Sequence, residues 1–194
     1  DFGLMMLTAA ATLALGIEEG ILVGVIVSLI AIIHEISQPH TAVEGRLPGT
    51  ETYRNLQRNP EAMTRASVVV VRMDASLSFA NASTFKDLIM ELDVKDPELR
   101  AVVINMYPVN RVDSTGAHTL HEIIEDCRRN GVDIYFAGVK GPVRDVLAEA
   151  GVIEQAGTDH FFHEVHDAVE TASDEAPGEI REAHVRSPEA VPSS

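Results

Sequence analysis

Residues 101–116 read Ala-Val-Val-Ile-Asn-Met-Tyr-Pro-Val-Asn-Arg-Val-Asp-Ser-Thr-Gly, and this stretch decides the fold that we expect. Its first six residues form an apolar, β-branched run, which is typical of a strand buried on both faces. After the glycine, apolar residues recur at helical spacing: Leu120, Ile123, Ile124 and Cys127. The stretch therefore predicts a buried strand, a turn, and a helix that begins near Gly116 or Ala117.

Similar patterns recur on both sides of this stretch. Further strands are predicted at Ser67–Met73 and Asp133–Ala137. Further helices are predicted from an apolar stripe between Phe85 and Leu92, from Pro142 at a helix start, and from the spacing of Phe162, Val165 and Val169. Strands that alternate with helices of this length predict an α/β domain, in which a central sheet is packed with helices.

The start of the predicted helix places an acidic residue and two hydroxyls together. Asp113, Ser114, Thr115 and Gly116 follow one another directly. Asp and Ser side chains accept hydrogen bonds from the free N–H groups of a first helical turn, so a structural cap is one interpretation. The same N–H groups also favour a phosphate, which leaves a regulatory site open as the other.

The order and spacing of several motifs resemble a known family. Asp113-Ser114-Thr115-Gly116, Gly131–Val139 and Val143–Val152 look like a STAS domain, named after sulfate transporters and anti-sigma-factor antagonists. Upstream, similar stretches occur in SulP-type (sulfate permease) anion transporters: Gly45–Glu51, Phe79–Ala82 and, at the end of that family's membrane domain, Ile17–Ile21. The chain is thus identified as resembling the C-terminal part of a SulP transporter.

This resemblance implies a function and a set of partners. It implies secondary active transport of sulfate, bicarbonate or another small inorganic anion, and a homodimer in which the STAS domain provides contact and regulation. The family's anion site would lie upstream of Asp1, so no substrate-binding residue is expected here. In anti-sigma-factor antagonists the hydroxyl before the glycine is the phosphoacceptor. Thr115 and then Ser114 are therefore the phosphoacceptor candidates, with Asp113 and Gly116 as the helix-start motif, and a regulatory protein on the STAS domain is a candidate partner.

The N-terminal region predicts contact with a lipid bilayer. Residues 2–33 are apolar except for Glu18 and Glu19, and a carboxylate in mid-membrane is costly. Two short transmembrane helices within residues 1–36, with a turn near residues 16–20, avoid that cost. A buried hairpin of a soluble protein is the alternative. Four arginines follow the apolar region, which predicts a cytoplasmic location after about residue 37 and suits a bacterial inner membrane: Arg46, Arg54, Arg58 and Arg65.

The rest of the chain divides as follows. Residues 37–66 are expected to be a linker with an edge strand around Thr41–Gly45, residues 67–172 the STAS core, and residues 173–194 a disordered acidic tail. The net charge of −15 argues against a nucleic-acid partner. A tethered STAS module that switches partners on phosphorylation, without transport, remains the alternative function.

Enzymatic and cofactor chemistry is not expected. No nucleophile, base and orienting group can be placed together from the sequence. His160, His163 and His166 recur every three residues, a spacing that drifts around a helix, so we predict no metal site. Gly138–Pro142 is interpreted as a packing turn rather than a phosphate loop, because it lacks the Gly-Lys-Ser/Thr ending. The single cysteine, Cys127, lies on an apolar stripe and is expected to be buried.

Overall fold

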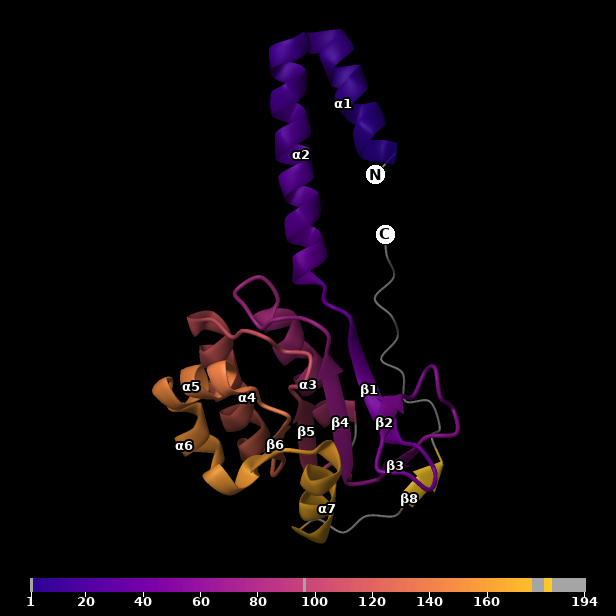
Figure 1. Cartoon of the computed structure of the whole chain (residues 1–194), viewed down its shortest axis with the longest axis vertical. Coiled ribbons are helices and arrows are strands. Elements are labelled where there is room, and N and C mark those ends of the chain that lie inside the picture. Colours follow the sequence, from indigo (N-terminus) through magenta and orange to yellow (C-terminus); the bar gives the residue numbers. More distant parts are fainter. Residues whose placement is uncertain (1, 96, 176–179, 183–194) are drawn as a thin grey trace. The chain divides into compact units, whose positions relative to one another are not determined.

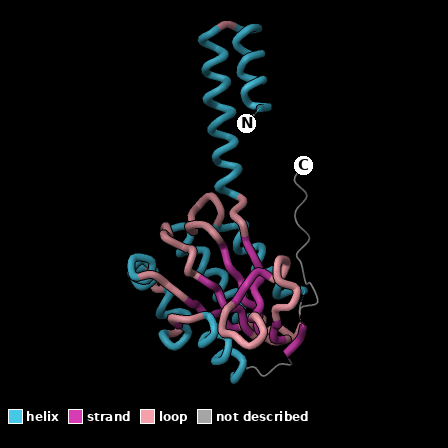
Figure 2. The backbone as a smooth tube through the Cα atoms, turned by 45° about the vertical axis from the view of Figure 1, so that its right-hand side comes forward, coloured by secondary structure: helices cyan, strands magenta, loops and turns pink. Residues whose placement is uncertain are grey.

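A computed structural model describes residues 2–95, 97–175 and 180–182 (Figures 1 and 2). Its chain divides into two compact units, Asp1–Pro39 and His40–Ser194. The first contains apolar helices and the second a mixed α/β domain, as the sequence predicts. The two units are described separately below.

The first unit is a helical hairpin. Helix α1 covers Phe2–Leu15, and helix α2 covers Ile17–Ser37. Gly16 separates them with a φ of 113°, a backbone conformation that residues other than glycine rarely adopt. At Gly20 the helices approach so closely that an added Cβ would lie 2.5 Å from the Cα of Thr12.

Helix α2 is longer than the short helix that we expected. It has 21 residues with a mean hydropathy of 2.2. In the part of the chain that the structure describes, α2 is the one helix that is long and apolar enough to cross a membrane. The reason is the position of Glu18 and Glu19, which form the first turn of α2 and do not interrupt it. Carboxylates at a helix N-terminus interact favourably with the helix dipole.

The second unit is built on one mixed sheet with the strand order β2-β1-β3-β4-β5-β6-β7, and β8 pairs with β3. Strands β4 to β7 are parallel to one another, whereas β1, β2, β3 and β8 pair antiparallel. The strands are β1 (Thr41–Arg46), β2 (Tyr53–Asn55), β3 (Met63–Arg65), β4 (Val68–Met73), β5 (Ala101–Asn105), β6 (Asp133–Ala137), β7 (Phe161–Phe162) and β8 (Ile180–Glu182).

Helices cover both faces of the parallel strands (Figure 1). One face forms the larger core with four helices, and the other packs against α7. The alternation of side chains along β4 shows the division, because Val71 and Met73 belong to the first core while Val68 and Val70 belong to the second. The helices are α3 (Ala82–Lys95), α4 (Ser114–Arg129), α5 (Gly141–Glu149), α6 (Val152–Ala156) and α7 (Val165–Glu175).

Strand β1 differs from the expected edge strand. It pairs with β4 through Thr41–Glu44 and with β2 through Glu44–Arg46, so it lies inside the sheet. Residues 37–66, which we interpreted as a linker, therefore contain three strands. Short strands of three residues show no readable periodicity, which is why β2 and β3 were not predicted.

The expected tail also begins later than predicted. Residues 173–175 are the last turn of α7, and Tyr135 donates a hydrogen bond of 2.6 Å to the Glu175 carboxylate. Residues 180–182 pair with β3 as strand β8. Residues 176–179 and 183–194 lie outside the described residues, and the disordered acidic tail stays a prediction for them.

We predict that a fragment of residues 40–182 is soluble and folded, and more stable than a fragment of residues 42–172. The shorter fragment loses β8, the Tyr135–Glu175 bond and the bond from Asp74 N–H to His40 O. Its Tm, measured by circular dichroism, should be lower by about 5 °C, which corresponds to roughly 2 kcal/mol in a domain of this size. Equal Tm values would mean that these contacts are not stabilising.

Candidate regulatory site at the start of helix α4

The start of α4 is held against a neighbouring turn by backbone contacts. Leu77 and Val112 form a parallel β-bridge. The Leu77 N–H donates to Arg111 O at 3.0 Å, and the Asp113 N–H donates to Leu77 O at 3.1 Å. Both Leu77 and Val112 are buried, so the turn before α3 and the turn before α4 are joined by packing as well as by hydrogen bonds.

The Asp113 side chain is the N-cap of α4. Its Oδ1 accepts from the Gly116 N–H at 2.8 Å, as helix capping predicts. Its Oδ2 accepts from the Phe79 N–H at 3.0 Å. Both carboxylate oxygens are thus used to join the two turns. Asp113 is therefore a positioning residue, which holds the hydroxyls that follow it.

Gly116 is required by close packing. Its backbone approaches that of Leu77 so nearly that an added Cβ would lie 2.8 Å from Leu77 O. Its φ is not in the left-handed region, so the constraint is space and not conformation. The helix begins at Ser114, two residues earlier than we predicted, because Asp113 caps it.

Ser114 and Thr115 are exposed in the first turn of α4. A phosphate on either residue would lie near the unpaired N–H groups of that turn and the positive end of the helix dipole. Both hydroxyls are thus accessible from solvent.

An exposed aromatic residue follows the turn that Asp113 binds. Phe79, whose N–H binds Asp113, leaves 76% of its surface accessible. Lys140, from the turn before α5, donates to Asn110 Oδ1 at 2.6 Å. In the sequence Phe79 is recognisable only as part of a family motif, since exposure is a tertiary property.

The turn at Gly138–Pro142 serves packing. Gly138 has a φ of 69°, and an added Cβ would lie 2.5 Å from the Tyr107 ring. Its absence of a side chain makes room for that ring. Tyr107 in turn donates to His163 O at 2.9 Å. These contacts agree with the interpretation as a packing turn.

The three spaced histidines have separate surroundings. His160 stacks on Tyr135 with ring centroids 4.3 Å apart, whereas the side chain of His166 lies near Tyr53, at 6.5 Å. His163 is exposed. Within the part of the chain that the structure describes, no group of three His, Cys, Asp or Glu side chains could hold a metal ion. Cys127 is buried on α4, as its position on the apolar stripe predicts.

Comparison with known proteins identifies the family. The profile of the STAS domain matches residues 59–172, which is more than half of the chain. The chain belongs to the STAS domain family, and the α/β fold predicted from the motifs is confirmed.

The relatives are transporters. The chain is 41% identical over 180 residues to probable sulfate transporter 4.2 of Arabidopsis thaliana, in an alignment that covers 88% of this chain and 27% of the relative. It is 31% identical over 168 residues to a probable sulfate transporter of Mycobacterium tuberculosis, covering 86% and 30%. The resemblance to sulfate permeases is thereby confirmed.

Among solved structures, murine Solute Carrier 26 family member A9, an anion transporter in the inward-facing state, is similar in fold. The TM-score is 0.77 at 23% identity, and the match covers 88% of this chain and 28% of that chain. The chain thus spans between a quarter and a third of the length of these three proteins.

We predict that Gly116→Ala lowers the free energy of unfolding by about 1–3 kcal/mol, because the new methyl group overlaps Leu77 O. The measurement is denaturant unfolding of the 40–182 fragment. Gly141→Ala is the matched control, since its Cβ would meet no described atom within 4 Å. Its effect should stay within about 0.5 kcal/mol. Equal effects at both positions would contradict the packing role of Gly116.

Proposed function

We propose that the chain is the C-terminal part of a secondary active anion transporter of the sulfate permease family. The hairpin would complete the membrane domain, and the domain from His40 onward would be its cytosolic STAS domain. Sulfate is the first candidate substrate, because the relatives named above are sulfate transporters. Bicarbonate or another small anion is the second.

One observation supports this proposal most strongly. The alignment with the Arabidopsis relative covers 88% of the chain, which is more than residues 40–194 alone can supply. The similarity to a sulfate transporter therefore extends into the apolar helices. A soluble STAS module would share the domain with these relatives but would have no need for the hairpin.

The hairpin has the properties that a membrane location requires. Its large apolar side chains are exposed, among them Leu13, Ile17, Ile21 and Ile30. Within a bilayer this surface would face lipid or other helices, and the backbone N–H and C=O groups are satisfied inside each helix. We place the domain after Pro39 in the cytoplasm, from the arginines that follow α2.

We predict that the full-length protein with this chain as its C-terminal part takes up radiolabelled sulfate in proteoliposomes, with saturation and with competition by chemically similar anions. Gly20→Leu should reduce uptake at least tenfold, because a side chain at Gly20 would overlap Thr12. Gly3→Leu is the control, since a Cβ at Gly3 meets no described atom within 4 Å. Failure to take up sulfate, bicarbonate or any other small anion would favour the tethered module.

We further propose that Thr115, or Ser114 beside it, is a regulatory phosphoacceptor of this domain. Both hydroxyls are exposed, and they follow Asp113, whose carboxylate joins the start of α4 to the turn that carries the exposed Phe79. Phosphorylation would add nearly two negative charges there and would change the affinity of a partner that covers this surface. The partner would be a regulatory protein or the second protomer of a dimer.

We predict a phosphorylated tryptic peptide of residues 112–128 in protein purified from its native cells, detected by mass spectrometry. Thr115→Ala should remove the phosphate and kinase-dependent partner exchange, while sulfate uptake stays within about twofold. Ser83→Ala is the control, because Ser83 is also exposed in the first turn of a helix. An unmodified peptide under all growth conditions would contradict the regulatory role and leave Asp113–Gly116 as a structural cap.

A further inference from the structure

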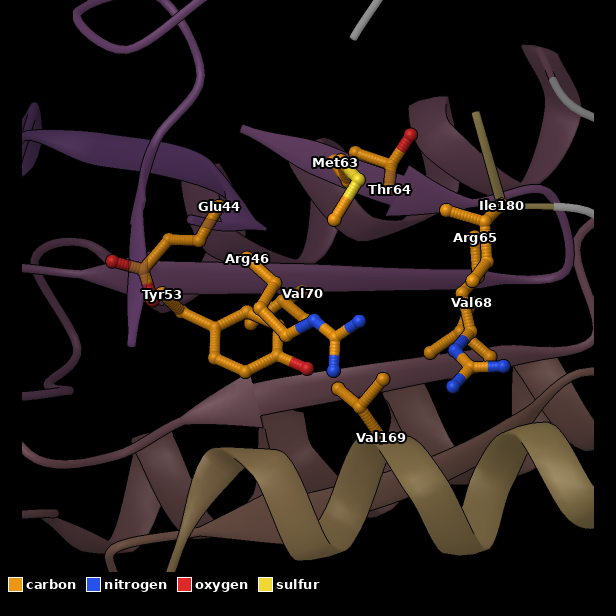
Figure 3. Close-up of a pocket in the computed structure, with 10 residues that line it drawn as sticks. All are labelled: Glu44, Arg46, Tyr53, Met63, Thr64, Arg65, Val68, Val70, Val169 and Ile180. Carbon is orange, nitrogen blue, oxygen red and sulfur yellow. The ribbon is translucent and has the colours of Figure 1, made fainter. Parts of the chain in front are cut away.

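A small cavity lies between the antiparallel strands and helix α7 (Figure 3). Its volume is about 20 Å³, which is room for one water molecule or one ion of similar size. Its walls come from β1, β2, β3, β4, β8 and α7. The apolar part of the wall is formed by Val68, Val70 and Val169.

Arg46 brings a positive charge to this cavity. Its guanidinium group lies next to the Tyr53 hydroxyl group, and both point toward α7. Among the described residues, Arg46 makes no ion pair. Arg65, the second arginine of the wall, is different, because its Nη2 lies 2.5 Å from the Glu170 carboxylate. The charge of Arg65 is thus compensated, and that of Arg46 is not.

Tyr53 provides a neutral hydrogen-bond donor. Burial raises its pKa to about 12. The nearby Arg46 and, more weakly, Arg65 act in the opposite direction, whereas the Glu170 carboxylate also raises the pKa. The hydroxyl therefore keeps its proton at neutral pH. Within the described part of the chain, this hydroxyl has no protein hydrogen-bond partner, and it is not a fully buried atom, so water can reach it. A guanidinium and a hydroxyl side by side present donors to the cavity without an acceptor.

The other polar residues of the wall do not supply that acceptor. Glu44 is 2% exposed, but its Oε1 lies 2.5 Å from Arg72 Nη1 and its Oε2 accepts from Asn105 at 2.7 Å. The Thr64 hydroxyl points away from Tyr53 in Figure 3. The cavity is therefore a positive, donor-lined and partly apolar space, where a charge interaction is less screened than in water.

We propose that this cavity binds one small monovalent anion of the size of chloride, held by the Arg46 guanidinium and the Tyr53 hydroxyl. The single uncompensated charge of Arg46 matches a monovalent anion better than a divalent one such as sulfate. The site would thus differ in selectivity from the proposed sulfate transport. An anion there would join β1 to β2 and α7, and so stabilise the domain.

The test is the broadening of the chloride NMR signal by the purified full chain, titrated with sodium chloride at constant ionic strength against sodium gluconate. Saturable broadening is expected, with bromide as a competitor and sulfate without effect. Arg46→Gln should weaken chloride binding at least about tenfold, because it removes a charged donor. Tyr53→Phe should weaken it less. Circular dichroism confirms that each variant is folded, and Arg46→Lys, which keeps the charge, should retain part of the binding.

Arg54→Gln is the matched control. Arg54 is the neighbour of Tyr53 in β2 but is exposed and absent from the cavity wall, so its removal takes away the same charge without the site. The proposal would be overturned if the protein did not broaden the chloride signal, or if Arg46→Gln broadened it as much as the unchanged protein does. It would also be overturned if Arg54→Gln reduced the broadening as much as Arg46→Gln does. So would chloride binding that appears only after removal of residues 183–194, since a carboxylate of the chain would then be the occupant. The measurement involves no transport, so its outcome is independent of the sulfate uptake assay.

Discussion

The burial of the parallel ladder β4-β5-β6 on both faces is the constraint on which the rest of the domain depends. All five residues of β5 are buried, so the central strand has no face left for water. Each face must then be covered by helices, and parallel strands need crossover connections that supply them. The helices α3 to α6 complete one core, and α7 completes the other.

The candidate regulatory site follows from this ladder. The turns after β4 and β5 leave the same edge of the sheet, because the two strands are parallel. Leu77 and Val112 meet there, and Asp113 joins the turns through both carboxylate oxygens. The exposed hydroxyls of Ser114 and Thr115 therefore lie where these two hydrogen-bonded turns meet.

The opposite side of the sheet is less completely covered. Helix α7 lies over the parallel strands, and the face of β1 to β3 beside it holds polar residues. Glu44 is buried there at the junction of three strands, with Arg72 and Asn105 as its partners. Burial of a carboxylate is tolerated because both of its oxygens are bound. Arg46, on the same strand, lacks such a partner among the described residues, and this difference distinguishes the proposed anion site from the structural junction.

The long elements could be predicted from the sequence, because periodicity is a local property. The sequence predicts the strands that contain Val68, Ala101 and Asp133, the apolar stripe of α4 and the Asp113 cap. The order of the motifs also indicates the family. Features that depend on pairing between distant segments could be seen only in the folded chain. In the folded chain β1 lies inside the sheet, β8 joins the sheet from the C-terminal region, and Arg46 and Tyr53 line one cavity. Strands of three residues and contacts between separate strands leave no periodic signal, so long-range packing had to reveal them.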